Sequence, residues 1–200
     1  MADEPELAVL RDRDAWTGGF YELAVQLGKP HDGRLQAALG ALARAAGADG
    51  PWQVQWDPDL FAPASWTVAD LDRCGHLRGL VMLPDGQRAI CSVINVREQD
   101  GDDWLDLCLP LEALGRLDAR VGGYPFGPDG GLVSLAWRRP VDDWLIGIAR
   151  QVARACPFRM AATGFEVSGN IRAEDLADAV RGDHAYALLM ADGAYVAATA

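Results

Sequence analysis

Three apolar runs in the middle of the chain constrain its fold more than any other feature. They are Leu77–Leu83, Arg88–Arg97 and Trp104–Leu109, and the gaps between them contain Pro-Asp-Gly and Asp-Gly turn sequences. Short apolar runs separated by such turns predict a three-stranded antiparallel meander. The middle run is apolar at both odd and even positions, so we expect it to be a central strand covered by helices on at least one side.

The remaining elements are predicted from hydrophobic period, capping residues and turn residues. Two strands around Thr17-Gly-Gly are expected to form a hairpin. The second of them alternates, with Tyr21, Leu23 and Val25 on one face and Glu22 and Ala24 on the other, so it is expected to be half exposed. The chain is expected to end in another hairpin. The expected strands are 6–11, 20–27, 53–56, 132–137, 158–167, 184–190 and 195–198. The expected helices run from Asp32 to Gly47, from Thr67 to Gly75, from Pro110 to Leu117, from Pro140 to Pro157 and from Asn170 to Gly182.

This order is dominated by hairpins and not by alternation of strand and helix. It predicts an α+β fold, with a mostly antiparallel sheet built on the central meander of about residues 77–109. Flanking hairpins and three to four helices are expected to pack on that sheet. The length suits a single domain over residues 1–200, with no internal repeat or linker.

The charge balance is strongly acidic, because 29 Asp and Glu residues stand against 18 Lys and Arg residues, for a net charge of −11. Such a charge repels phosphate backbones and anionic bilayers, so we expect neither a nucleic-acid nor a membrane partner. A basic protein partner and a cationic ligand are both compatible with this charge, and so is a charge that serves only to keep the protein soluble. Lys29 is the only lysine, which together with abundant Ala, Gly and Arg indicates a GC-rich, bacterial-type coding background.

The sequence also indicates a reduced, cytoplasmic protein. No apolar run approaches the roughly 18 residues that a membrane span needs, and the acidic N-terminus does not resemble a signal peptide. The four cysteines are widely separated and form no C-x-x-C pair, so no disulfide framework is expected.

Known catalytic and phosphate-binding signatures are missing from the sequence, including the P-loop, G-x-G-x-x-G, H-E-x-x-H and G-x-S-x-G patterns. We therefore expect no cofactor, and a non-catalytic protein is favoured over an enzyme. The weak metal candidates are Asp70, Asp72, Cys74 and His76, at a spacing of two. On a strand they would share one face and offer metal ligands. The Thr67 cap instead predicts a helix, which separates them.

A second acidic group comprises Glu98, Asp100, Asp102, Asp103 and Asp106. Oxygen ligands of this kind suit calcium, but no Glu closes a twelve-residue calcium loop. We interpret the group as a solvated hairpin turn.

The best pointer to a binding site is the loop Val121–Gly131, which is rich in Gly and Pro yet contains aromatic residues. Its glycines and prolines exclude a helix or a central strand. Tyr124, Phe126 and Asp129 are its candidate binding residues, either as a pocket wall or as a plug over the edge of the core. Trp16, Trp52 and Trp56 lie near turns and are the other candidates for an exposed recognition surface. The alternative for these three is partial burial under long loops.

These observations lead to three functional hypotheses. The first is a non-catalytic acidic protein that binds a basic protein partner, as an immunity protein or an inhibitor does. The second is a small-molecule-binding protein or unusual enzyme with its site under the loop 121–131. The third is a structural subunit of an assembly, which predicts a large apolar interface. The oligomeric state and the identity of any ligand do not follow from the sequence.

Overall fold

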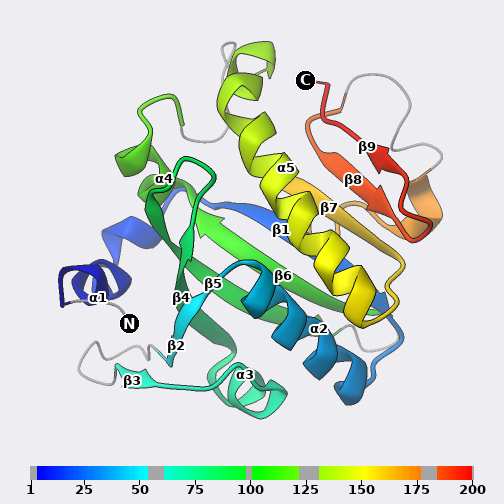
Figure 1. Cartoon of the computed structure of the whole chain (residues 1–200), viewed down its shortest axis with the longest axis horizontal. Coiled ribbons are helices and arrows are strands. Elements are labelled where there is room, and N and C mark those ends of the chain that lie inside the picture. Colours follow the sequence, from blue (N-terminus) through cyan, green and yellow to red (C-terminus); the bar gives the residue numbers. More distant parts are fainter. Residues whose placement is uncertain (1–3, 54–60, 98–100, 122–130, 177–183, 200) are drawn as a thin grey trace.

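The computed structural model describes residues 4–53, 61–97, 101–121, 131–176 and 184–199, and these form an α+β fold (Figure 1). The strands are β1 (Phe20–Gly28), β2 (Asp49–Gln53), β3 (Ala62–Pro63), β4 (His76–Met82), β5 (Arg88–Arg97), β6 (Asp103–Pro110), β7 (Met160–Phe165), β8 (Ala187–Met190) and β9 (Tyr195–Val196). The helices are α1 (Glu4–Arg11), α2 (Asp32–Ala45), α3 (Val68–Cys74), α4 (Leu111–Leu117) and α5 (Gly131–Ala155), with 3₁₀ turns η1 (Asp14–Trp16) and η3 (Ala173–Asp175).

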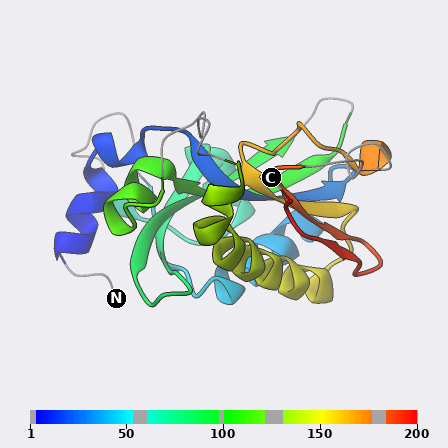
Figure 2. The ribbon, with the colours of Figure 1, turned by 90° about the horizontal axis from the view of Figure 1, so that it is seen from above.

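All nine strands belong to one antiparallel sheet in the order β3-β2-β4-β5-β6-β1-β7-β8-β9. The predicted meander β4-β5-β6 is confirmed, and its middle strand has the predicted bounds. Helices α2 and α5 cover one face of the sheet, which is plain in the two perpendicular views (Figures 1 and 2). We call the opposite side of the sheet the second face.

Strand β1 lies at the centre of the sheet, between β6 and β7, and is buried on both faces. The sequence predicts this strand correctly but wrongly predicts it to be half exposed, as one arm of an N-terminal hairpin. Successive side chains of β1 point alternately to the two faces of the sheet, and both faces are covered there. Tyr21, Leu23 and Val25 enter the core under α2 and α5, whereas Glu22 and Ala24 point to the second face.

The segment predicted as the first hairpin strand is helix α1, so that prediction is wrong. Leu7 and Leu10, three residues apart, pack against the second face, while Val9 is 41% exposed. A run of four apolar residues fits the periods of both helix and strand, so the period is not decisive. Glu6 in the first turn and Arg11 in the last turn favour the helix through its dipole.

A strand predicted at 132–137 is also wrong, because these residues form the first turns of α5. The helix continues through Pro140, which the sequence indicates as a helix start. The reason lies in a polar stripe at a spacing of four: Ser134, Arg138 and Asp142 are all buried on one side of α5. Helical geometry is the one that places these three side chains together.

Most of the polar stripe of α5 has hydrogen-bond partners, in the sheet, within the helix and before β8, but Asp142 Oδ2 has none among the described residues. Asp142 Oδ1 accepts hydrogen bonds from the Tyr21 hydroxyl (2.7 Å) and the Thr163 hydroxyl (2.6 Å), and Arg138 donates to Ser134 Oγ and to the carbonyl of Ala185. Burial raises the pKa of Asp142 to about 6 despite these bonds. This network fixes α5 on β1 and β7.

Smaller differences concern helix ends. Helix α2 is capped by His31, whose Nδ1 accepts from the backbone of Arg34, and not by Asp32. Asn170 caps no helix, and its side-chain amide instead donates a hydrogen bond to the carbonyl of Glu166. Of the helix predicted from Asn170 to Gly182, the structure shows the 3₁₀ turn η3 followed by Leu176, and residues 177–182 lie outside the described residues.

Two other expectations agree with the structure: the Thr67 cap of α3 and the terminal hairpin β8–β9. Five helices are present in the described part of the chain: α1, which is not predicted as a helix, and four that correspond to predicted helices. None of them has both the length and the apolar character that crossing a bilayer requires.

Candidate functional site

The second face carries two rows of chemically unusual side chains across the middle of the sheet. In the first row Arg78, Ser92, Cys108 and Glu22 occupy directly opposed positions on β4, β5, β6 and β1. In the next row His76, Ile94, Asp106 and Ala24 are opposed in the same way. Opposed residues on neighbouring strands are in contact range, so the register alone brings two acids, a thiol and a hydroxyl together.

Asp106 has a strongly perturbed pKa. It is fully buried, and neither of its carboxylate oxygens has a hydrogen-bond partner of acceptable geometry among the described residues. Burial, and then the neighbouring charge of Glu22, raise its pKa to about 8, while the nearby Ser168 side chain opposes the shift without cancelling it. At neutral pH Asp106 is therefore mainly protonated.

Glu22 connects this buried acid to the protein surface. Its Oε1 accepts a 2.6 Å hydrogen bond from the backbone of Ser168, and the Cys108 thiol lies 3.9 Å from its Oε2. Burial raises the pKa of Glu22, and the charge of exposed Glu166 raises it further. The charges of Glu166 and Glu22 therefore repel each other, whereas Asp106 is mainly protonated at neutral pH and contributes little charge.

This arrangement does not activate a nucleophile. Burial, followed by the charges of Asp106 and Glu22, raises the pKa of the Cys108 thiol well above its usual range. A nucleophilic cysteine needs the opposite, a pKa lowered by nearby positive charge. Burial and then Arg78 lower the pKa of His76, so its imidazole is neutral at neutral pH. The raised pKa of the thiol and the neutral imidazole both argue against thiolate chemistry at this cluster.

A cavity of about 370 Å³ lies beside this cluster, at the ends of β7 and β8. Buried Val167 and Ile171 provide apolar surface, whereas Glu166, Asn170 and Asp175 are exposed. Phe165 and Tyr186 complete the described lining, which contains no basic residue. We call this cavity the acidic pocket.

Two glycines allow the walls of the acidic pocket to approach the sheet. A Cβ on Gly19 would lie 2.7 Å from the ring of Phe165 and 2.8 Å from Oε1 of Glu166. A Cβ on Gly164 would lie 2.8 Å from Cγ1 of Val167. Glu166 itself has a φ of 44°, a left-handed conformation that is unfavourable for a glutamate. Its backbone therefore fixes this carboxylate at the pocket against its own preference.

A second, smaller cavity of about 130 Å³ lies between α4, α5 and the β4–β5 turn. Its apolar lining includes Leu114, Trp137 and Val121, and its charged lining includes Asp118 and Arg120. Val121, which lines this cavity, is the first residue of the predicted binding loop. Tyr124, Phe126 and Asp129, the predicted binding residues of that loop, lie outside the described residues.

Two of the three tryptophans predicted to form a recognition surface, Trp16 and Trp52, lie within the described residues. Trp16 and Trp52 do come together, in a cluster with Phe61 between α1 and the second face. The guanidinium of Arg78 lies 3.9 Å from the ring centre of Trp16, and Trp52 stacks on Phe61 with ring centres 6.0 Å apart. Both tryptophans are half-buried, so they serve in packing α1. Trp56 lies outside the described residues.

The weak metal candidates do not converge. Asp70, Asp72 and Cys74 lie on α3, and His76 begins β4. The Asp70 carboxylate is already bound by Arg73 (2.6 Å) and by the backbone of Ser65. Within the described ranges no three His, Cys, Asp or Glu side chains are grouped so as to hold a metal ion.

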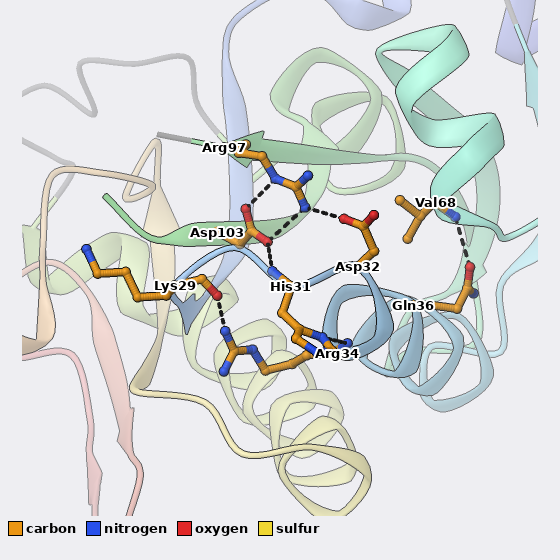
Figure 3. Close-up of polar contacts among 8 residues, drawn as sticks. All are labelled: Lys29, His31, Asp32, Arg34, Gln36, Val68, Arg97 and Asp103. Atoms are coloured by element: carbon orange, nitrogen blue, oxygen red, sulfur yellow. Dashed lines mark hydrogen bonds and ion pairs between the residues drawn. The ribbon is translucent and has the colours of Figure 1, made fainter. Parts of the chain in front are cut away.

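The acidic turn near β6 is not solvated as expected. Asp103 is buried and accepts hydrogen bonds from Arg97 (2.8 Å) and from the backbone of His31, while Arg97 also reaches Asp32 (Figure 3). Asp102 is likewise buried and binds Arg159 at 2.8 Å. Asp103 joins the β5–β6 hairpin to the start of α2, and Asp102 joins it to Arg159 just before β7, so the role of both acids is structural. Glu98 and Asp100 lie outside the described residues.

The acidic pocket and the carboxylates behind it are not predicted from the sequence. One signal was present: Glu22 and Asp106 are acids inside strands that are otherwise mainly apolar. The pocket residues lacked such a signal, because the segment from Phe165 to Asp175 has no clear period.

Comparison with known proteins adds no relative to this picture: no protein-family model, curated protein or solved structure matches the chain.

Proposed function

We propose that the chain is a non-catalytic binding protein that recognises a basic protein partner through the acidic surface around the acidic pocket. An immunity or inhibitor role in the cytoplasm of a bacterial-type cell fits this proposal. The observation that carries it is the pocket itself, which combines apolar surface with two exposed carboxylates and no described base. The net charge of −11 acts in the same direction at longer range.

The pairing of the other acids supports this choice of surface. Many carboxylates are neutralised by arginines, as in the pairs Arg97–Asp103 and Arg159–Asp102. Glu166 and Asp175 form no ion pair with a described residue, and they are exposed. Unpaired exposed carboxylates steer a cationic partner toward themselves and give binding that weakens with salt. A nucleic-acid partner is disfavoured for the same reason.

The test is affinity capture with the immobilised protein at roughly 0.05 M and 0.5 M salt, which changes the screening length severalfold. The expected result is a specific protein with an excess of Lys and Arg, retained at low salt and released at high salt. The purified partner must then bind the purified protein in the same salt-dependent way. Failure to recover any specific partner, or binding that is indifferent to salt, contradicts the proposal.

The small cavity beside Val121 favours one second candidate, a small-molecule site in the region of the predicted loop. Its mainly apolar lining suits a small apolar ligand, although its volume of about 130 Å³ is below the usual size of ligand sites. A thermal-shift screen of small aromatic compounds tests this, with Leu114→Trp as the variant that fills the cavity. A stabilising compound that also stabilises the filled variant binds elsewhere.

A further inference from the structure

We propose that the acidic pocket binds the guanidinium group of an arginine side chain that the basic partner displays. This inference rests on the proposed function and specifies its chemistry. The partner's arginine would lay its methylene groups over the apolar lining and direct its charged end to the carboxylates of Glu166 and Asp175. Long basic side chains bind in this divided way, with an apolar stem and a charged end.

The size and lining of the pocket agree with such an occupant. A cavity of about 370 Å³ is at the small end of the range for ligand sites, which suits a single side chain better than a large cofactor. Val167 and Ile171 are 5% and 7% exposed and offer apolar surface for the stem. Asn170 adds an amide that can accept one N–H of the guanidinium.

The electrostatics behind the pocket favour a cation for an independent reason. Glu22 lies on the adjoining part of the second face, where its described partners are the backbone N–H of Ser168 and the thiol of Cys108 and no described base pairs with it. The charge of Glu166 raises the pKa of Glu22, which means that the two carboxylates repel each other. A bound cation at Glu166 relieves this repulsion, so the protein gains more from it than from an isolated surface carboxylate.

Arginine fits this pocket better than lysine does. Its guanidinium is planar, presents several N–H groups at once and is less strongly hydrated than an ammonium group. It can therefore reach two carboxylates while lying against an aromatic ring. Glu166 and Asp175 supply the carboxylates, and Phe165 and Tyr186 are the aromatic residues of the lining.

The experiment uses short neutral glycine-serine peptides with one central arginine, lysine or citrulline, titrated into the isotope-labelled full chain and followed by NMR. We expect the arginine peptide to shift the amide signals of residues 165–175 and 186, with a dissociation constant on the order of millimolar. The lysine peptide is expected to bind about threefold or more weakly, and the uncharged citrulline peptide not measurably. Equal binding of arginine and lysine, or shifts confined to other regions, overturns the inference.

Variants test the residues directly. Glu166→Asn removes the carboxylate but suits the left-handed backbone, since Asn tolerates a positive φ better than Glu does. Glu166→Asn and Asp175→Asn are each expected to weaken arginine-peptide binding about fivefold or more. Asp72→Asn, an exposed acid on α3, is the control and should leave binding unchanged. Thermal melting verifies that all three variants are folded. Undiminished binding by both pocket variants refutes the site.

The same reagents separate this inference from the proposed function. If a salt-sensitive basic partner is captured but binds Glu166→Asn and Asp175→Asn as tightly as the parent protein, the pocket inference fails and the function stands. Free arginine amide, titrated in the same way as the peptides, tests whether the pocket binds a small guanidinium compound as tightly as an arginine in a peptide. If it binds as tightly as the arginine peptide and no basic protein is captured, the pocket binds a free guanidinium compound and the partner proposal fails.

Discussion

Replacing Asp106 by Asn should make the protein more stable at neutral pH, and the gain should vanish in acid. The side chain is fully buried on β6, and its carboxylate oxygens lack hydrogen-bond partners among the described residues. Its pKa is about 8 in the folded protein, against an ordinary value of 3.8. Asn has a similar shape but does not titrate, so the variant removes the ionisation while keeping the packing.

The sign and magnitude follow from proton linkage. Between pH 3.8 and pH 8 the folded state holds the proton of Asp106 and the unfolded state does not, so the free energy of unfolding falls as pH rises. Each pKa unit corresponds to about 1.4 kcal/mol, and about three units separate 3.8 from pH 7, which gives about 4 kcal/mol. The buried amide of Asn costs roughly 1–3 kcal/mol at every pH. A net gain of about 1–3 kcal/mol at pH 7 remains.

Urea denaturation of the parent protein and Asp106→Asn between pH 4.5 and 7.5 measures this effect. The difference in unfolding free energy between the two proteins should grow steadily with pH. Asp142, whose pKa is about 6, titrates in both proteins and so cancels in the difference. Asp72→Asn is the exposed control and should follow the parent protein. Parallel pH profiles for the parent and Asp106→Asn would refute the reasoning, because they require an Asp106 that ionises in the folded state as it does in the unfolded one.

Three other substitutions test the contacts that hold the fold. Tyr21→Phe removes a buried 2.7 Å hydrogen bond and should cost about 1–2 kcal/mol in urea denaturation, whereas Tyr195→Phe at the exposed edge should cost less than about 0.5 kcal/mol. His31→Ala removes the cap of α2 and should cost about 1 kcal/mol, while His31→Asn should retain most of it; equal losses would contradict the capping role. Arg97→Met leaves the buried carboxylate of Asp103 without its charged partner. It should lower the free energy of unfolding by about 2 kcal/mol, a figure that allows for the partial exposure of Arg97, and it should lower the melting temperature accordingly. Arg97→Lys should restore part of the lost stability.

The fold was predictable where local signals agreed. Two turn sequences and three apolar runs correctly predicted the strands of the meander. The Thr67 cap and the glycine at position 75 correctly predicted helix α3. Predictions failed where a short apolar run fitted both periods, as in α1, or where a proline suggested a boundary, as at Pro140. In α5 the packing of a buried polar stripe outweighed the local cost of an internal proline.

The candidate site could not be predicted to the same degree. Glu22 and Cys108 are 86 positions apart in the chain, and only the pairing of β1 with β6 makes them neighbours. The acidic pocket depends on Gly19 lying under Phe165 and Glu166, a contact between segments that share no motif. Strand alternation did predict that Glu22 faces away from Tyr21. The alternation did not predict that the second face, to which Glu22 points, is covered so that Glu22 is buried.

The chemistry of the second face is better explained by function than by stability. Apolar side chains of similar volume in place of Glu22 and Asp106 would avoid both the desolvation of two carboxyl groups and their mutual repulsion. On the other face, by comparison, Asp142 Oδ1 accepts two hydrogen bonds, from the hydroxyls of Tyr21 and Thr163. Local rules that are broken without compensation concentrate at functional sites. Because Glu22, Asp106 and the acidic pocket occupy the same side of the sheet, we expect the proposed cationic partner to bind on that side.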